Sequence, residues 1–411
     1  MTSPSPTLPI EEVRSRFPAL HRREDGREVA YLDGPGGTQM PQIVIEAMAS
    51  ILENGISNLG GGYGPSIAAD EITASGRRAM ADFLNADPGE IVFGQNMTSL
   101  TFALSRALAG TWNAGDAIIV TSLDHDANYT PWVRAAGEHG VEVRLAEFDS
   151  TTGVLDPETV IDLLDDRVRL VAVCLASNSL GTLVDIAPIS AAAHEAGAVV
   201  FVDAVHASPH RSIDVERLGC DFIAVSGYKF FGPHIGVLYG RIDHLAALDA
   251  YKVRPAPSDP PGKWETGTQS FEAIAAVTAA VDYIAELGGG GDTRRASLLR
   301  AYENISAYET GLSRQFLAGI DELSKVRLYG VPEAGDRRVS TFAIGIDGYH
   351  PDDAAQRLLA NGLYVWSGHY YAVNAMAELG VLEEGGLVRI GFVHYNTSQE
   401  VDRVLETLAE L

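Results

Sequence analysis

Short apolar runs alternate with helix-like runs between about residues 90 and 240, and this alternation limits the folds open to the chain. Amphipathic stretches such as 98–110 and 186–197 lie between the apolar runs. The order is typical of βαβ units with a mostly parallel sheet, whose ligands bind beyond the carboxyl ends of the strands. The runs predicted to be strands include DAIIVTS (116–122), VEVRLAEF (141–148), RLVAVCLAS (169–177), AVVFVDAV (198–205) and DFIAVS (221–226).

Four consecutive glycines at 288–291 mark a break after which the pattern changes. The amphipathic stretch 293–320 is predicted to be a long helix leading into an α+β part. A chain of 411 residues is long for one hydrophobic core, so two domains are expected. The predicted division is an N-terminal segment over 1–30 that packs on the small domain, a large domain over 31–287 and a small C-terminal domain over 288–411.

The charge balance excludes some classes of partner. With 55 acidic and 30 basic residues, the formal net charge is -25, and such a field repels nucleic acid and anionic membranes. The two cysteines, Cys174 and Cys220, cannot form a disulfide framework. The polar N-terminus lacks a signal-peptide core, and no run of ~18 apolar residues occurs. We expect a cytoplasmic protein with neither nucleic-acid nor membrane partners, and no metal site.

Lysine is scarce, which narrows the search for a reactive amine. It occurs only at Lys229, Lys252, Lys263 and Lys325. Lys229 directly follows the predicted strand DFIAVS in a glycine-rich turn, SGYKFFGP. An amine at a strand's carboxyl end can form an imine with an aldehyde cofactor. A surface loop lysine is the alternative, and the neighbouring motifs favour the cofactor role.

Asp203 ends the apolar strand AVVFVD. A carboxylate that closes a buried strand needs a partner, because burying an isolated charge is costly. A pyridine nitrogen is a suitable one: the carboxylate keeps it protonated, and the ring becomes an electron sink. A helix cap or turn is the alternative. Asp203 and Lys229 end successive strands, so both can converge on one ring.

Further polar groups follow the other strands. Asn96, Met97, Thr98 and Ser99 open a helix after IVFGQ, where free N–H groups and hydroxyls suit phosphate, although simple capping is the alternative. His125 follows another strand and can stack on a flat ring or move protons. The remaining candidates are His206 for a phenolic oxygen of the cofactor, Asn178 on the neighbouring strand, and Arg389 for a substrate carboxylate.

Together these segments resemble the class V aminotransferase family, which includes cysteine desulfurases, selenocysteine lyases, kynureninase and isopenicillin N epimerase. The resemblance runs from YLDGPGGTQMP (31–41) to VRIGFVHYNT (388–397). It implies an α/β, aspartate-aminotransferase-like fold of type I. In that fold a mostly parallel seven-stranded sheet lies between helices and a smaller α+β domain follows. It also implies pyridoxal 5'-phosphate (PLP) as cofactor.

The matched motifs imply individual roles. DHDAN, VDAVH and SGYK identify His125, Asp203 and Lys229 as the catalytic residues, with Lys229 as the Schiff-base lysine. WETGTQS identifies Thr268 as a donor to the phosphate of the partner subunit's PLP, which implies a homodimer with active sites shared across the interface. The implied cofactor contacts are Asn96, Met97, Thr98, His125, Asn178, Asp203, His206, Ser226, Tyr228, Lys229 and Thr268.

The chain departs from the desulfurases at one loop. Their mobile loop carries a cysteine in a segment of the type T-G-H-x-C-A, whereas this chain has SGHYYA, with Tyr371 at the cysteine position. Cys174 lies inside a predicted strand and Cys220 precedes one, so both are interpreted as buried. Without a thiolate on the loop, a persulfide mechanism has no nucleophile.

The expected function is therefore a PLP-dependent reaction of an amino acid, in which the released Lys229 amine takes the Cα proton. We favour β-elimination of the C–S lyase type without a persulfide. Class V aminotransfer is the alternative, followed by epimerisation and a non-catalytic PLP-binding protein. A nucleotide-binding oxidoreductase is disfavoured, because LGGGYGPS (59–66) does not follow an apolar strand and is not G-x-G-x-x-G.

No single motif identifies the side chain of the substrate. The substrate-binding candidates are Arg389 for the carboxylate, with Tyr63, His369, Tyr370 and Tyr371 and the loop 60–62 as lining. An aromatic, glycine-rich lining suits a substrate that is bulkier or less charged than free cysteine. Packing of these rings between the domains is the alternative.

Overall fold

A seven-stranded sheet forms the centre of the molecule in this computed structural model, which describes residues 8–24, 26–291 and 293–411. Only β10 runs antiparallel to its neighbours, β4 and β9. The predicted α/β fold with a mostly parallel sheet is thereby confirmed. The strand order is β4 (Ile91–Gly94), β10 (Gly236–Gly240), β9 (Phe222–Ser226), β8 (Val199–Asp203), β7 (Val168–Cys174), β5 (Ala117–Thr121) and β6 (Glu142–Ala146).

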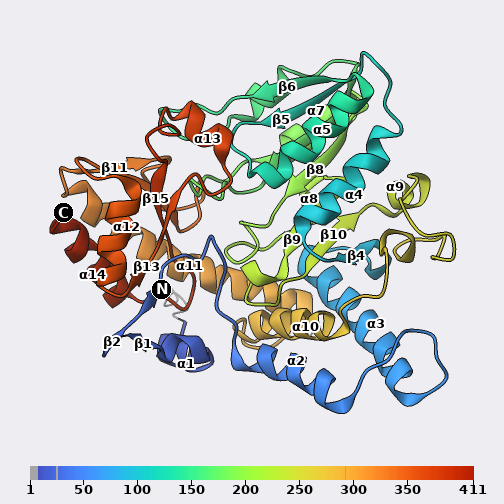
Figure 1. The fold of residues 1–411 in the computed structure, drawn as a ribbon, viewed down its shortest axis with the longest axis horizontal. Helices are drawn as coiled ribbons and strands as arrows, with labels where there is room; N and C mark the ends of the chain where they lie inside the picture. The colour runs from blue at the N-terminus through green and yellow to red at the C-terminus, as the bar shows by residue number, and fades with distance from the viewer. Residues whose placement is uncertain (1–7, 25, 292) are drawn as a thin grey trace, which may run out of the picture.

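Alternate side chains along the strands of the sheet belong to two separate hydrophobic cores. On β8, Val200 and Val202 belong to one core and Phe201 to the other, because successive side chains point to opposite faces. One face is covered by α4 (Met97–Ala109) and α5 (Thr130–His139), seen in front of the sheet in Figure 1. The other core includes residues of α3 (Gly64–Leu84), α7 (Ile186–Glu195) and α10 (Phe271–Glu286), the last of which packs on α2 (Gln42–Asn54). Helices on both faces explain why the inner strands are mostly apolar, whereas the edge strand β6 carries the charged residues Glu142 and Arg144.

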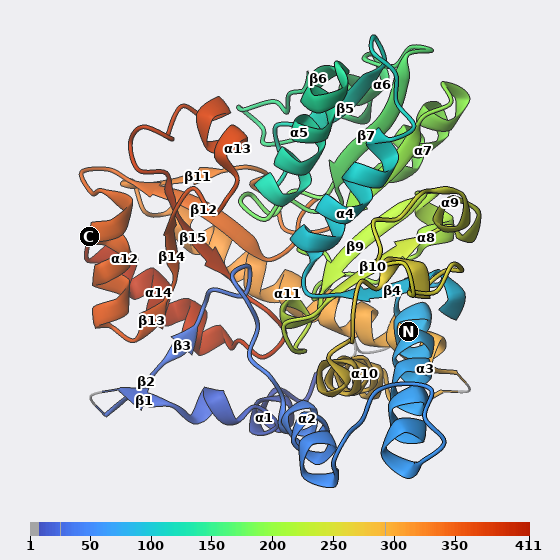
Figure 2. The same cartoon turned by 45° about the vertical axis from the view of Figure 1, so that its right-hand side comes forward.

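A second, antiparallel sheet lies in the C-terminal part, which Figure 2 shows beside the large sheet. Its order is β11 (Val326–Tyr329), β12 (Thr341–Ile346), β15 (Leu387–Gly391) and β14 (Trp366–Gly368). Helices α12 (Pro351–Ala360) and α14 (Ser398–Ala409) cover it, and a third core fills the space between them. The short strand β13 (Leu363–Tyr364) pairs in parallel with β3 (Ala30–Tyr31).

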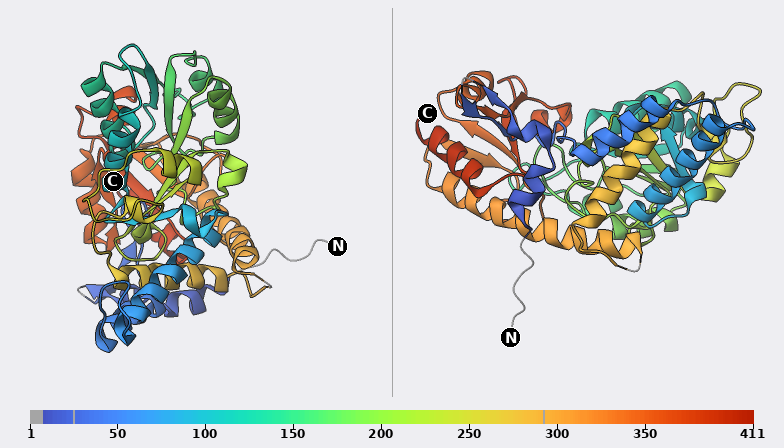
Figure 3. Two further views of the ribbon diagram at one scale, coloured as in Figure 1. Left: turned by 90° about the vertical axis from the view of Figure 1, so that its right-hand side faces the viewer. Right: turned by 90° about the horizontal axis from the view of Figure 1, so that it is seen from below.

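The 28-residue helix α11 (Arg294–Asp321) joins the two parts, as Figure 3 shows in orange from below. Its first half places Leu298 and Ile305 in the core of the large sheet, and its second half places Phe316 in the core of the small sheet. One helix thus contributes side chains to the cores of both sheets. The remaining short elements are α1 (Ile10–Ser15), β1 (Arg23–Glu24), β2 (Arg27–Glu28), α6 (Pro157–Ile161), α8 (Val215–Leu218), α9 (Ile242–Ala247) and α13 (Val373–Glu378).

The described part of the N-terminal segment contacts both parts of the molecule. Phe17 packs edge-on against Tyr283 of α10, with ring centroids 5.5 Å apart. Arg14 donates to Glu400 of α14 at 3.1 Å. Residues 1–7 and 25 of the predicted 1–30 segment lie outside the described residues, and the domain boundaries at 30 and 287 stay predictions. Within the described ranges, no helix combines the length and apolarity needed to cross a membrane.

Candidate active site

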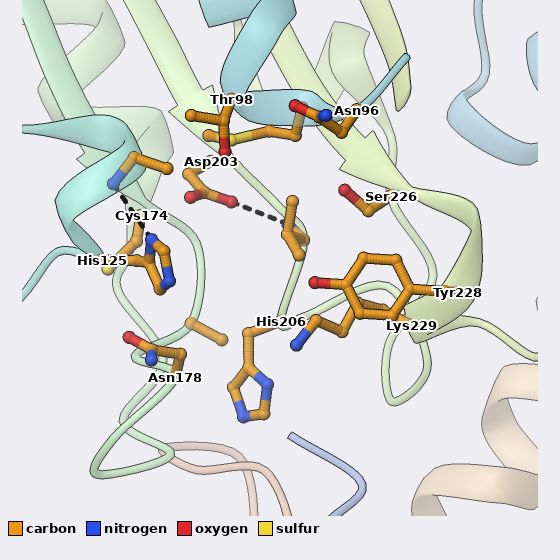
Figure 4. Close-up of a pocket in the computed structure, with 14 residues that line it drawn as sticks. Asn96, Thr98, His125, Cys174, Asn178, Asp203, His206, Ser226, Tyr228 and Lys229 are labelled. Atoms are coloured by element: carbon orange, nitrogen blue, oxygen red, sulfur yellow. Dashed lines mark hydrogen bonds between the residues drawn. The ribbon is translucent and has the colours of Figure 1, made fainter. Parts of the chain in front are cut away.

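Side chains from several strand ends of the large sheet converge on one cavity, here called the inner cavity (Figure 4). The strands β8 and β9 end at Asp203 and Ser226, and their parallel direction brings these ends to the same edge. Every predicted cofactor contact except Thr268 lines this cavity. Its lining is Asn96, Met97, Thr98, His125, Ala127, Cys174, Ala176, Asn178, Asp203, Val205, His206, Ser226, Tyr228 and Lys229.

Lys229 lies in a tight turn, Gly227–Lys229, directly after β9. The turn requires glycine at 227, because a Cβ there would lie 2.6 Å from the Pro233 carbonyl oxygen. The Lys229 side chain is buried, and Nζ donates to the carbonyl oxygen of Pro35. Burial and the nearby Arg389 lower the pKa of Lys229 to about 7, against the opposing charges of Asp33 and Asp203. A large part of the amine is therefore neutral, and nucleophilic, at neutral pH.

Asp203 is buried at the end of β8. Its Oδ1 accepts a hydrogen bond from the Val205 N–H at 2.9 Å. Burial raises the pKa of Asp203 to about 6, although the Val205 N–H and Lys229 oppose the shift. The raised pKa indicates that the Asp203 carboxyl has no close cationic partner among the described residues. A protonated ring nitrogen in the inner cavity would supply one and lower the pKa again.

The N-terminus of α4 forms the polar end of the inner cavity. The Asn96 side chain caps this helix by accepting from the Ser99 N–H at 2.8 Å. The hydroxyls of Thr98 and Ser226 lie at the same end (Figure 4). Gly236 lets β10 approach this turn, because a Cβ there would lie 2.3 Å from the Asn96 carbonyl carbon. Helix N–H groups together with hydroxyls make a site for a phosphate.

His125 forms one wall of the inner cavity. Its Nδ1 accepts from the Ala127 N–H at 3.0 Å, so the other ring nitrogen carries the proton. Burial lowers the pKa of His125 to about 4, with added effects of Lys229 and Arg389. The ring is therefore neutral at pH 7. It stacks on Tyr371 with centroids 5.4 Å apart and an interplanar angle of 23°.

Arg389 reaches the site from β15 of the small sheet. It donates to Asp33 Oδ1 at 3.0 Å and to the Asn178 carbonyl oxygen at 3.1 Å, and its guanidinium lies 4.6 Å from the Tyr370 ring centroid. The Asn178 amide donates to the Tyr370 carbonyl oxygen at 2.9 Å. Arg389 Nε and Asn178 Oδ1 are buried without a partner among the described residues. Because buried polar atoms are normally paired, these two fit a polar ligand bound here.

His206 connects the inner cavity to the small sheet. Its Nε2 lies 2.9 Å from the Thr341 hydroxyl of β12, and burial lowers its pKa well below the ordinary value. Behind it, His210 Nδ1 and Glu309 Oε2 of α11 form a buried pair at 2.7 Å. These contacts fix the loop after Asp203 against the C-terminal part.

An outer cavity of about 720 Å³ leads outward from Lys229. It contains four of the predicted substrate contacts: Arg389, His369, Tyr370 and Tyr371. Its lining is Pro35, Gly36, Thr98, Phe102, His125, Asp126, Ala127, Thr130, Pro131, Asn178, Tyr228, Lys229, Trp366, Ser367, Gly368, His369, Tyr370, Tyr371 and Arg389.

Two predicted side chains lie outside both cavities, as does the predicted lining loop 60–62. Thr268 lines a separate depression with Phe93 and Trp264, and its hydroxyl accepts from the Asn58 amide at 3.3 Å. Tyr63 is 56% exposed at the start of α3, and its hydroxyl lies 2.7 Å from that of Ser57. Within one chain, neither reaches the atoms around Lys229.

Sequence reasoning missed two carboxyl groups that lie next to residues of the site. Asp33 pairs with Arg389 across 356 positions of the chain, which no local motif signals. Asp124 is buried beside His125, and burial raises its pKa to about 8. It bonds to the Thr121 hydroxyl and, at 2.7 Å, to the Asn128 amide. Its position within the DHDAN motif was a usable signal.

Comparisons with known proteins match this chain from end to end. The sequence profile of the family described as aminotransferase class-V matches residues 30–404. A cysteine desulfurase of Yersinia pestis is 33% identical over 98% of both chains. The structure of a Thermococcus onnurineus cysteine desulfurase has a TM-score of 0.89 at 28% identity, covering 100% of this chain and 99% of the other. An Escherichia coli cysteine desulfurase gives a TM-score of 0.85 at 26% identity, with 98% coverage of each.

Proposed function

Since this chain belongs to the class-V aminotransferase family and is a PLP-dependent enzyme, we propose that it catalyses β-elimination from an amino acid without a protein-bound persulfide. The observation that carries the proposal is Tyr371, which stands in the loop where a desulfurase needs its thiol. A phenol, with a reference pKa of ~10, is a poor acceptor for sulfur.

The residues of the inner cavity fit PLP. Thr98, Ser226 and the N-terminus of α4 would hold the phosphate, and Asp203 would face the ring nitrogen. The neutral His125 ring would stack on the cofactor ring, and Lys229 would hold the cofactor covalently. When bound, PLP supplies an electron sink for bonds breaking next to the substrate's amino carbon.

Two residues of this chain would handle the substrate itself. The Arg389 guanidinium is positioned by Asp33 and Asn178, and would bind the substrate carboxylate. The Lys229 amine, with its pKa near 7, would take the Cα proton and then donate it to the departing sulfur. The Cβ–S bond then breaks, the sulfur leaves with the electron pair as a thiol, and water releases ammonia and a keto acid.

Neither cysteine suits a role as sulfur acceptor. Cys174 and Cys220 are free and buried, and burial raises the pKa of both thiols. Cys174 lines the inner cavity, but with a pKa well above its ordinary value it stays protonated there. Free cysteines also support the cytoplasmic location that we propose for the protein.

The test is whether sulfur ever becomes attached to the protein. We expect the holoenzyme to release a free thiol or sulfide, ammonia and a keto acid from cysteine or S-substituted cysteines, with no persulfide detected by mass spectrometry of the intact protein. The double variant Cys174→Ser/Cys220→Ala should give the same products. A persulfide on either cysteine, formed together with alanine, would restore a desulfurase assignment.

We further propose a homodimer in which Thr268 reaches the phosphate bound by the partner. Three exposed apolar side chains of α2 and the start of α3 support an interface near the Asn58–Thr268 contact: Leu52, Tyr63 and Ile67.

Thr268→Ala should weaken PLP binding by roughly 10-fold, the scale of one hydrogen bond to a charged group. Sedimentation should show a dimer. Mixing Thr268→Ala with an inactive Lys229→Ala protein should restore intact sites, because the Lys229→Ala subunit still supplies Thr268. A monomer with full activity would refute this arrangement.

A further inference from the structure

The outer cavity has aromatic walls on both sides. Phe102 of α4 and Pro131 of α5 come from the large sheet's helices, while Trp366 and Tyr371 come from the C-terminal part. Trp366 lies directly opposite Arg389 in the antiparallel pair of β14 and β15. Because cross-strand partners share a face of the sheet, the indole stands next to the guanidinium that would bind the substrate carboxylate.

Two of these rings are unusually exposed. Tyr371 is 66% exposed and Trp366 is 56% exposed, although both line a cavity that leads to Lys229. Large apolar surfaces are normally removed from water, and exposed ones that gather at one cavity mark binding sites. A flat apolar group entering the cavity would cover both rings.

The backbone around Tyr371 is held in a conformation that bulky residues rarely adopt. Tyr370 has a φ of 51° and Tyr371 a φ of 59°, both in the left-handed region. Hydrogen bonds hold the loop there: the Asp126 N–H donates to the Tyr371 carbonyl oxygen at 2.7 Å, and the Asn178 amide donates to that of Tyr370 at 2.9 Å. A glycine at position 371 would adopt this backbone conformation without strain. The chain instead has a tyrosine there, and the loop places its ring against His125.

The charged residues that line the outer cavity provide few partners for a charged side chain of a substrate. Lys229 and Arg389 have roles toward the cofactor and the carboxylate. Asp126 is the other charged residue of the lining, and its Oδ2 accepts from the Thr130 hydroxyl at 2.9 Å. An anionic side chain would meet the Asp126 carboxylate with no further Lys or Arg in the lining to balance it.

We propose that the substrate carries a planar aromatic group beyond its β-sulfur, as in S-benzyl- or S-arylcysteines, and that this ring packs between Tyr371 and Trp366. The inference rests on the proposed β-elimination. In the reaction the Cα–H proton is removed and the Cβ–S bond breaks. The aromatic thiolate leaves with the bonding pair and takes up a proton, and one water converts the remainder to pyruvate and ammonia.

The experiment compares S-benzyl-L-cysteine with S-methyl-L-cysteine as substrates of the holoenzyme. We expect kcat/KM to be roughly 10- to 100-fold higher for the benzyl compound, from burial and stacking of one ring. Tyr371→Gly accepts the left-handed backbone but removes the ring, so it should cut the ratio of the two kcat/KM values about 10-fold. Tyr371→Phe should retain the preference. The matched control is Leu359→Ala, an equally simple truncation on exposed α12, which should change neither value.

Failure of the aromatic site and failure of the proposed β-elimination would give different results. If both compounds react equally and Tyr371→Gly affects them alike, the aromatic site is refuted while β-elimination stands. If neither compound releases thiol, β-elimination is refuted. The aromatic site then stands if S-benzylcysteine perturbs the cofactor absorbance in the wild type at about 10-fold lower concentration than in Tyr371→Gly. Equal titrations in those two proteins would overturn it.

Discussion

Lys229→Ala should abolish the visible absorbance of covalently held PLP and nearly all turnover. The amine has two proposed tasks, holding the cofactor and moving the Cα proton. Loss of a positioned acid–base group alone costs about 10²- to 10⁴-fold in rate. The other three lysines cannot substitute, because each is engaged elsewhere. Lys252 donates to the Ala256 carbonyl oxygen, Lys263 to those of Ala246 and Leu248, and Lys325 to that of Leu411.

Borohydride reduction of the holoenzyme followed by peptide mapping checks this assignment. The label should lie on the peptide that contains SGYK, and Lys252→Ala, the matched control, should keep both absorbance and label. With its pKa near 7, the Lys229 amine gains nucleophilicity as pH rises through 7, so PLP capture by cofactor-free protein should accelerate over that range. Label on any other lysine would refute the site.

The strand-end residues could be predicted from the sequence because parallel strands share one carboxyl edge. Asp203 and Lys229 follow consecutive apolar runs, and β8 and β9 are indeed neighbours in the sheet. The same reasoning placed His125 and Asn178 at the cavity, because β5 and β7 belong to the same parallel set. The seven strands themselves were predicted through the family resemblance, and the structure confirms them.

Contacts that depend on the packing of distant segments could not be predicted. The Pro35 carbonyl oxygen meets Lys229 only because the segment after β3 crosses the cavity. Trp366 was not among the predicted substrate contacts, since its place beside Arg389 follows from the pairing register of β14 and β15. The role of Tyr63 in substrate binding stays a prediction. Its glycine-rich surroundings predicted a lining residue, yet within one chain it lies outside both cavities.

Asp203→Asn should leave PLP bound but reduce turnover by roughly 10²-fold or more, the scale seen when one preorganised polar group is removed from an active site. The amide oxygen can still accept from the Val205 N–H, so the local fold is preserved. What is lost is the charge. Burial raises the Asp203 pKa to about 6 against the opposing effects of the Val205 N–H and Lys229. A protonated ring nitrogen would stabilise the carboxylate, which in return would keep that nitrogen protonated.

Asp124→Asn provides a matched control, because it changes a second buried carboxyl next to the same cavity. Burial raises the Asp124 pKa to about 8, so the group is mostly neutral at pH 7 and the amide removes little charge. An asparagine can also donate to the Thr121 hydroxyl and accept from the Asn128 amide. Steady-state kinetics and a cofactor titration of both variants distinguish the effect of a lost charge from the effect of altered packing. Turnover should fall only in Asp203→Asn; near wild-type turnover in that variant would mean that Asp203 serves the fold and that another group controls the ring nitrogen.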